Sequence, residues 1–264
     1  MKVIYNDGRV DQCAPEEELH VIRHTAAHIL AQAVKRLYPG AHFAYGPATD
    51  KGFYYDVDLG EDKLSDEDLE AIEKEMRKIV KENLPIKPSI LPRDEAIRLM
   101  EERGEIYKVE HIGDLADDAP ISFYTQGEYV DMCTGPHLTY TKALKAFKIT
   151  GQSGAYWKND KNNKMLTRIN GTAFATQAEL DEHMKLLEEA EKFSLKEAKT
   201  LRRLVDESTI IKDTMTCIER FKNVELREPT KDELQTYINE FYGSDSWDLS
   251  ELPDNYIETG KSIL

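Results

Sequence analysis

The chain has 264 residues, of which 40% are hydrophobic, so it can fill the core of one large domain or two small ones. Its net charge of −15 argues against non-specific attraction to nucleic acid, because phosphate binding requires a positive surface. Three cysteines are too few for a disulfide framework, and the apolar runs are far shorter than the roughly 20 residues that span a bilayer. We therefore expect a cytoplasmic protein with no membrane contact.

The first long element is a helix predicted over residues 15–37, after a short strand at residues 3–5. Pro15 and the glutamates that follow it are typical of a helix N-terminus, and Pro39 begins the signal that ends the pattern. Apolar residues recur at helical spacing between them, so we expect a largely buried helix. His24 and His28 lie four residues apart on one face of it, where a buried ring needs a partner, a metal or a substrate.

The remaining elements alternate between strands and helices. Periodicity and turn residues predict helices over residues 65–83, 93–103, 177–204 and 231–241. The same signals predict strands over residues 52–59, 85–92, 105–111, 121–124, 128–131, 147–150, 155–157 and 165–169. The strand at residues 105–111 carries Lys108.

A second pair of candidate ligands lies in the turn after residue 131. Cys133 and His137 enclose the sequence Cys-Thr-Gly-Pro-His. Together with His24 and His28 they offer three imidazoles and one thiol, a set that suits zinc. A His-xxx-His pair alone is more often two tolerated polar residues on a helix. The presence of the second pair favours a metal or catalytic site instead.

Charge is distributed unevenly along the chain. Residues 139–170 contain seven basic side chains and one acidic side chain, whereas residues 205–264 contain fourteen acids and six basic residues. An RNA contact should therefore use the first stretch and avoid the second. On charge alone, a solvated face is the simpler interpretation. The basic residues are Lys142, Lys145, Lys148, Lys158, Lys161, Lys164 and Arg168.

Four segments, at residues 22–40, 52–59, 129–137 and 154–176, resemble a known family. They are similar to the editing domain of threonyl-tRNA synthetases, the second additional domain that alanyl-tRNA synthetases share in looser form. We expect an α+β fold in which an antiparallel sheet wraps around a central helix with the His-xxx-His motif, followed by a long C-terminal helix and a small acidic extension. The resemblance divides the chain into a short segment at residues 1–17, the editing domain at 18–200 and an acidic extension of unknown role at 201–264.

The resemblance implies a proofreading deacylase that hydrolyses mischarged seryl-tRNA(Thr) and releases serine. Serine lacks one methyl group of threonine, which changes binding by only about 1–3 kcal/mol, so a second site that excludes the larger side chain raises accuracy. The implied partners are the acceptor end of tRNA(Thr) and a threonyl-tRNA synthetase. No class II motif is found after residue 200, so we expect a freestanding domain without aminoacylation activity.

The resemblance also assigns roles to individual residues. His24 contacts the terminal ribose or aids proton transfer, and Lys108 serves the attacking water or the oxyanion. Asp131 accepts the α-ammonium of the substrate. Tyr54 and Tyr55 bracket the terminal adenine, although strand alternation favours core packing for at least one of them.

His28, Cys133 and His137 complete the catalytic group beside His24. Hydrolysis with no required cofactor is the first expectation for this cluster. Zinc bound by His24, His28, Cys133 and His137 is the second, and a nucleophilic Cys133 is the third.

Three other interpretations stay open. In the first, the chain is an alanyl-type editing deacylase. In the second, it is a non-catalytic module that binds tRNA or a synthetase, and in the third it is a synthetase fragment with an incidental tail. The sequence does not indicate an oligomeric state.

Overall fold

The computed structural model describes residues 1–189 and 230–242. Internal contacts divide the chain into two compact units, Met1–Met184 and Lys185–Leu264. Residues 177–189 are helical, and the rest of the helix predicted to residue 204 lies outside the described residues, as does the predicted boundary near residue 200. Helix α6 (Lys231–Tyr242) confirms the helix predicted at residues 231–241. No helix in the described ranges is both long enough and apolar enough to cross a bilayer.

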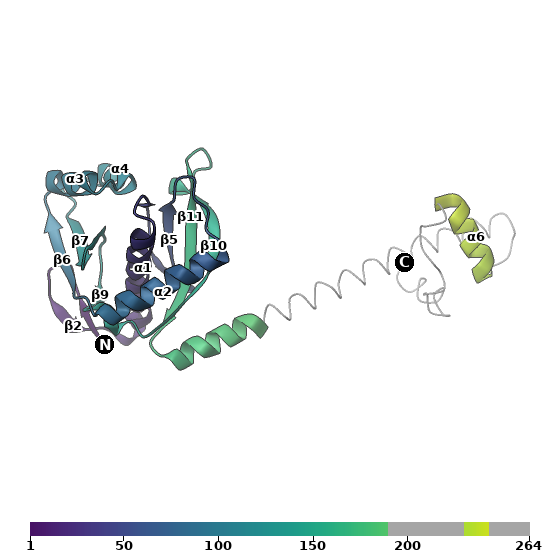
Figure 1. Cartoon of the computed structure of the whole chain (residues 1–264), viewed down its shortest axis with the longest axis horizontal. Helices are drawn as coiled ribbons and strands as arrows, with labels where there is room; N and C mark the ends of the chain where they lie inside the picture. The colour runs from purple at the N-terminus through teal and green to yellow at the C-terminus, as the bar shows by residue number, and fades with distance from the viewer. Residues whose placement is uncertain (190–229, 243–264) are drawn as a thin grey trace. The chain divides into compact units, whose positions relative to one another are not determined.

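Three antiparallel sheets form the first unit, and its mixture of helices and strands confirms the α+β class (Figure 1). The largest sheet has the order β10 (Ala146–Tyr156), β11 (Met165–Phe174), β5 (Gly52–Asp58) and β3 (His42–Phe43), with β4 (Ala48–Thr49) also paired to β5. A second sheet joins β6 (Ile86–Leu91), β7 (Ile121–Gln126) and β8 (Tyr129–Met132). The third joins β2 (Val10–Gln12), β1 (Lys2–Ile4) and β9 (His137–Leu138).

Helix α1 (Glu18–Leu37) follows a short 3-10 turn, η1 (Pro15–Glu17), and confirms the helix predicted at residues 15–37. It is buried from Val21 to Val34 apart from His24, which is half-buried. In Figure 1 it runs between the sheet of β6 and β7 and the sheet of β5, β10 and β11. Side chains of α1 contact both sheets, so residues on this helix can meet residues from distant parts of the chain.

Helix α2 (Asp66–Glu82) packs against α1 and confirms its predicted limits. Its N-terminus carries a capping box, in which the Ser65 hydroxyl accepts from the Asp68 backbone and the Asp68 carboxylate accepts from Ser65. Asn83 ends it in the left-handed conformation with φ of 56°. Helix α3 (Arg93–Glu102) likewise forms where it was predicted.

The strand predicted at residues 105–111 is wrong, because this segment forms helix α4 (Ile106–Asp114). Ile106, Tyr107 and Val109 have high β-propensity, which favours a strand locally. Tertiary contacts override that preference: the helix buries Lys108 and Ile112, four residues apart, on one face, and Tyr107 donates a hydrogen bond of 2.6 Å to Asp58. Lys108 therefore projects from a helix and not from a strand.

The two strands predicted at residues 147–150 and 155–157 are a single strand, β10. The glycines at 151 and 154 suggested a break between them. Instead the register with β11 shifts between Ile149 and Gly151, and pairing continues to Tyr156. A β-bulge absorbs the irregularity, so the glycines bend the strand without ending it.

Candidate active site

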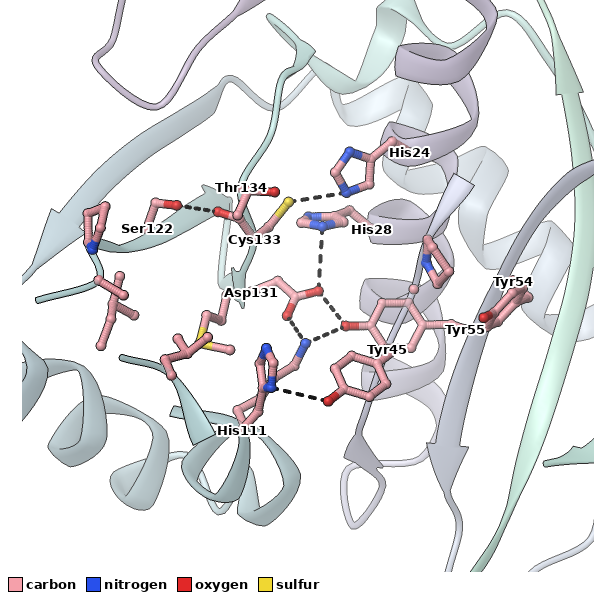
Figure 2. A pocket seen from close by; sticks show the side chains of 18 residues that line it. His24, His28, Tyr45, Tyr54, Tyr55, His111, Ser122, Asp131, Cys133 and Thr134 are labelled. Atoms are coloured by element: carbon pink, nitrogen blue, oxygen red, sulfur yellow. Dashed lines mark hydrogen bonds and ion pairs between the residues drawn. The ribbon is translucent and has the colours of Figure 1, made fainter. Parts of the chain in front are cut away.

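The two predicted pairs, His24 with His28 and Cys133 with His137, meet in one cluster. Figure 2 shows three of these side chains, His24, His28 and Cys133, side by side. Cys133 Sγ lies 3.1 Å from His24 Nε2 and 3.2 Å from His137 Nε2. One ligand atom from each of the four residues lies within 4.8 Å of the others. A helix and a turn more than a hundred residues apart in the sequence thus supply one group of polar atoms.

The turn after β8 is held in place by its own hydrogen bonds. Ser122 Oγ on β7 donates to the Cys133 carbonyl at 2.6 Å, and the Gly135 backbone N–H donates to Cys133 Sγ at 3.2 Å. Gly135 has a φ of 58°, and a Cβ there would overlap the ring of Tyr124. Glycine is therefore required twice over at this position, by conformation and by space.

A second network adjoins the cluster, centred on Asp131. Lys108 Nζ lies 2.8 Å from Asp131 Oδ1, and the Tyr55 hydroxyl donates to Oδ2 at 2.5 Å. Lys108 also donates to the Tyr55 oxygen at 3.0 Å, and His28 Nε2 lies 3.6 Å from Asp131 Oδ2. All four side chains are buried, so this charge pair is held in a low-dielectric environment.

Burial controls the protonation of the cluster. It lowers the pKa of His24 to about 3, with further lowering by His28 and His20 that the Asp131 carboxylate and the Pro136 carbonyl oppose. It lowers the pKa of His28 to about 4 against the opposing effect of Asp131, and it lowers the pKa of His137 as well. Burial raises the pKa of Cys133 to about 12. At neutral pH the cluster therefore holds three neutral imidazoles and a thiol.

Asp131 behaves differently from its neighbours. Burial raises its pKa, but the Lys108 ammonium and the adjacent His28 outweigh that effect, so the pKa stays below its usual value. Burial and the Asp131 charge together raise the pKa of Tyr55 far above its usual value. The network is therefore a carboxylate, an ammonium partner and a phenol that keeps its proton.

A cavity of about 590 Å³ opens beside both groups. His24, His28, Cys133, Lys108 and Asp131 line its polar side. The apolar residues that line it include Leu115, Ala119, Pro120, Ile121 and Met132. The cavity therefore offers room for a small polar group next to the cluster and for a flatter, less polar group beside it.

The predicted site residues do not all reach this cavity. Tyr54 and Tyr55 both line it, but the Tyr55 side chain is in the core and only Tyr54 is half-buried, with the Arg168 guanidinium 3.8 Å above its ring. His137 does not line the cavity and is fully buried behind Cys133. Four of the five residues expected to be catalytic therefore line the cavity, and His137 does not.

Sequence reasoning missed three residues at the site. Tyr45 and His111 line the cavity and are joined by a hydrogen bond of 3.1 Å, and Thr25 lies 3.1 Å from the His137 ring. Thr25 lies between His24 and His28 on α1, and a threonine inside an apolar helical stretch was the available signal. Tyr45 and His111 have no spacing that would have linked them.

The basic stretch at residues 139–170 is largely neutralised by nearby acids. Ion pairs join Lys148 to Glu73, Lys158 to Glu110 and Asp114, Lys164 to Asp58, and Arg168 to Asp56. None of the seven basic residues lines the cavity. Only Lys142, Lys145 and Lys161 of these seven residues are exposed and have no ion pair among the described residues. The basic surface is therefore smaller than the sequence predicted.

The cluster fits a zinc ion by its donor set. Zinc binds nitrogen and sulfur ligands at about 2.0–2.3 Å in a tetrahedron, which places them within about 4 Å of one another. The four ligand atoms lie close to that range, and the imidazoles are neutral. The thiol would have to lose its proton on binding, as coordinating thiols do.

Comparison with known proteins matches residues 121–170 to the family described as the threonyl and alanyl tRNA synthetase second additional domain. These residues include β7, β8, Asp131, Cys133 and His137. The chain contains a tRNA synthetase second additional domain.

The second additional domain has relatives among threonine–tRNA ligases. The chain is 56% identical over 177 residues to the enzyme of Clostridioides difficile, covering 67% of the chain and 28% of the relative. It is 53% identical over 194 residues to that of Clostridium novyi, covering 73% of the chain and 30% of the relative. With the enzyme of Carboxydothermus hydrogenoformans the identity is 54% over 177 residues, 67% of the chain and 28% of the relative. The chain spans less than a third of the length of these relatives.

Proposed function

We propose that this domain hydrolyses the ester bond of seryl-tRNA(Thr) in the cytoplasm and releases serine. The observation that carries the proposal is the meeting of two polar groups on one cavity wall: the His24, His28 and Cys133 side chains, and the buried pair of Lys108 and Asp131. Ester hydrolysis needs a positioned water, a proton acceptor and donors for the developing oxyanion. The relatives ligate threonine to tRNA, which makes tRNA(Thr) the substrate to test first.

The role of each residue is proposed from the contacts that it already makes. Asp131 is proposed to receive the α-ammonium of the seryl group, but Lys108 already pairs with it. Two ammonium groups beside one carboxylate repel each other, so substrate binding would displace Lys108 toward the ester. There it would face the oxyanion or the attacking water. Lys108 is therefore the proposed catalytic residue. His24 and His28 are proposed to contact the ester and the terminal ribose.

Hydrolysis without a metal is our first proposal for the cluster, and zinc is the second. When bound, zinc would supply a Lewis acid for the ester carbonyl, held by His24, His28, Cys133 and His137. Element analysis of protein prepared without added zinc, and deacylation measured after chelation, distinguish the two. Full activity of the chelated, zinc-free protein supports the first proposal.

The test is release of serine from seryl-tRNA(Thr) in the presence of purified protein. We expect serine release by the wild type and a large loss in Lys108→Met. Lys142→Met serves as the matched control, because Lys142 is exposed and does not line the cavity. Binding of tRNA without release of serine would contradict the proposal and favour a non-catalytic module.

An alanyl-type deacylase is the second candidate, since the matching family includes alanyl tRNA synthetases. The same assay with seryl- and glycyl-tRNA(Ala) separates the two. Faster release from tRNA(Ala) than from tRNA(Thr) would replace the first candidate by the second.

A further inference from the structure

Tyr45 and His111 form a polar pair on the cavity wall that the proposed hydrolysis does not use. The Tyr45 hydroxyl and His111 Nδ1 lie 3.1 Å apart, and both side chains line the cavity. In Figure 2 the pair lies on one side of Asp131, whereas His24 and Cys133 lie on the other. The cavity therefore has polar groups on both sides of the Asp131 carboxylate.

Aromatic packing holds the pair in place. The Tyr45 ring stacks on the ring of Trp157, which is buried, with the centroids 4.9 Å apart and the planes at 25°. The His111 ring meets the Tyr45 ring edge-on, with the centroids 5.2 Å apart. The indole N–H of Trp157 donates a hydrogen bond of 3.0 Å to Glu110, the residue before His111 on α4. Rings packed in this way have few alternative positions, so the pair is preorganised.

Both members of the pair are uncharged at neutral pH. Burial lowers the pKa of His111, and the Lys108 ammonium lowers it further against the opposing Asp114 carboxylate. Burial also raises the pKa of Tyr45, an effect that the nearby Lys158 ammonium opposes only in part. A neutral imidazole and a phenol that keeps its proton complement a neutral polar group better than an ion.

The hydrogen bond within the pair leaves one donor and one acceptor unused in either tautomer of His111. If Tyr45 donates to Nδ1, the ring N–H at Nε2 and the phenol oxygen remain. If Nδ1 carries the ring proton, the phenol O–H and the bare Nε2 remain. Neither side chain makes another hydrogen bond in the part of the chain that the structure describes. A hydroxyl group both donates and accepts, so it can satisfy the pair in either case.

The pair lies within reach of a seryl group whose ammonium is bound at Asp131. His111 lies three residues after Lys108 on α4, which places their Cβ atoms about 5–6 Å apart, and Lys108 Nζ lies 2.8 Å from Asp131. The seryl Cα carries the ammonium, the ester carbon and the side chain. With the ammonium at Asp131 and the ester toward His24, the side chain is directed away from α1, toward the Tyr45 hydroxyl.

The other hydroxyl groups at this part of the cavity already have partners or lie elsewhere. Tyr55 donates to Asp131, and Ser122 donates to the Cys133 carbonyl. Thr134 follows Cys133, on the side of the cavity proposed for the ester (Figure 2). The neutral pair on α4 and the segment before β4 is therefore the best-placed partner for the seryl hydroxyl.

We propose that Tyr45 and His111 form the subsite that binds the side-chain hydroxyl of the substrate amino acid. This inference rests on the proposed deacylase function and adds a specificity to it: serine is bound through its hydroxyl, and alanine, which lacks one, is disfavoured. Alanine is smaller than serine, so the cavity cannot exclude it by size. A site built to hydrogen-bond a hydroxyl discriminates against the analogue without it, because the polar groups of the site are then left unpaired.

Single-turnover deacylation of seryl-tRNA(Thr) and alanyl-tRNA(Thr) by the wild-type protein tests the subsite without any substitution. We expect the seryl ester to be hydrolysed about tenfold faster, as the loss of one or two hydrogen bonds implies. Equal rates, or faster hydrolysis of the alanyl ester, would overturn the inference.

Two substitutions test the residues themselves. Tyr45→Phe and His111→Leu remove the hydrogen-bonding groups and keep side chains of similar size. We expect each to lower the ratio of the seryl rate to the alanyl rate, and the double variant to bring this ratio close to one. Tyr156→Phe is the matched control, because Tyr156 is exposed and does not line the cavity, and it should keep the wild-type ratio.

The ratio separates recognition from a loss of structure. Unfolded protein lowers both rates by the same factor and leaves their ratio unchanged. A double variant that keeps the wild-type ratio would therefore show that another group recognises the hydroxyl.

A binding measurement separates this inference from the proposed function. The probes are seryl-adenosine and alanyl-adenosine in which an amide replaces the ester, and calorimetry measures their affinities. If the seryl probe binds about tenfold tighter and the double variant loses this difference, but no serine is released from tRNA, the proposed function fails and the subsite stands. If serine is released but the two probes bind equally, the subsite fails and the function stands.

Discussion

Lys108 and Asp131 form an ion pair of 2.8 Å in which the two side chains are only 6% and 3% exposed. They come from different elements, since Lys108 lies on α4 and Asp131 on β8. A buried charge that loses its partner is strongly destabilising, whereas the intact pair adds little net stability. A role at the cavity therefore explains this pair better than a contribution to the stability of the fold does.

Asp131→Asn should lower the free energy of unfolding by about 3–5 kcal/mol, because it leaves the Lys108 ammonium buried without a counter-charge. The double variant Lys108→Met/Asp131→Asn should be less destabilised than the sum of the two single variants, with a coupling energy of roughly 1–3 kcal/mol. Urea unfolding of the four proteins measures both values. Additive effects would show that the two charges do not depend on each other.

Gly135→Ala should destabilise the protein more than Gly60→Ala. Both glycines have positive φ, 58° and 67°, so alanine is strained by about 1–2 kcal/mol at either position. Only at Gly135 does the added Cβ also meet a neighbour, the Tyr124 ring, whereas the position at Gly60 is open. Thermal unfolding of the matched pair checks this. Equal losses would mean that the turn before His137 yields to the clash.

Cys133→Ala should retain most of the deacylation rate. Because burial raises the pKa of Cys133 to about 12, almost no thiolate exists at neutral pH, and the thiol is a poor nucleophile. Single-turnover deacylation measures the rate. Complete loss of activity, with an unchanged fold by circular dichroism, would support either a covalent role or a metal bound by the thiol.

Glu128 should make the stability of the protein depend on pH in the acid range. Hydrogen bonds from Arg36 lower its pKa to about 2, so it stabilises the fold fully above its unfolded pKa and loses this contribution as the pH falls through about 2. Glu128→Gln should therefore cost at most about 1 kcal/mol at neutral pH, since the side chain is 58% exposed, and nothing near pH 2.

The measurement for Glu128 is urea unfolding of wild type and variant across the acid range. Glu61→Gln is the control, because Glu61 is exposed and pairs with no cation among the described residues. A difference that grows as the pH falls would contradict the assigned direction of the pKa shift.

The sequence predicted helices better than it predicted the contacts between them. The α1 limits and its burial could be predicted, because helical periodicity is a local property. The meeting of His24 with Cys133 was predicted from the chemistry of the residue types, since three imidazoles and a thiol suit one site. Helix α4 could not, because residues 105–111 favour a strand and only packing against Asp58 and the core makes them helical.

The predicted tRNA groove shows the same limit. Lys164 and Arg168 look unpaired in the sequence, but Asp58 and Asp56 on the distant strand β5 pair with them. Thr25 was missed because its partner, His137, lies more than a hundred residues away. Strand pairing brings Lys164 and Arg168 to β5, and packing of α1 against β9 brings Thr25 to His137. The local sequence carries no signal for either arrangement.

We propose that the cavity edits tRNA by hydrolysing the ester of the smaller amino acid. Single-turnover hydrolysis of seryl-tRNA(Thr) and threonyl-tRNA(Thr) by the wild-type protein, under the same conditions, tests this proposal. We predict faster release of serine by at least about tenfold, since one methyl group separates the substrates. Equal rates, or no hydrolysis of either ester, would contradict it.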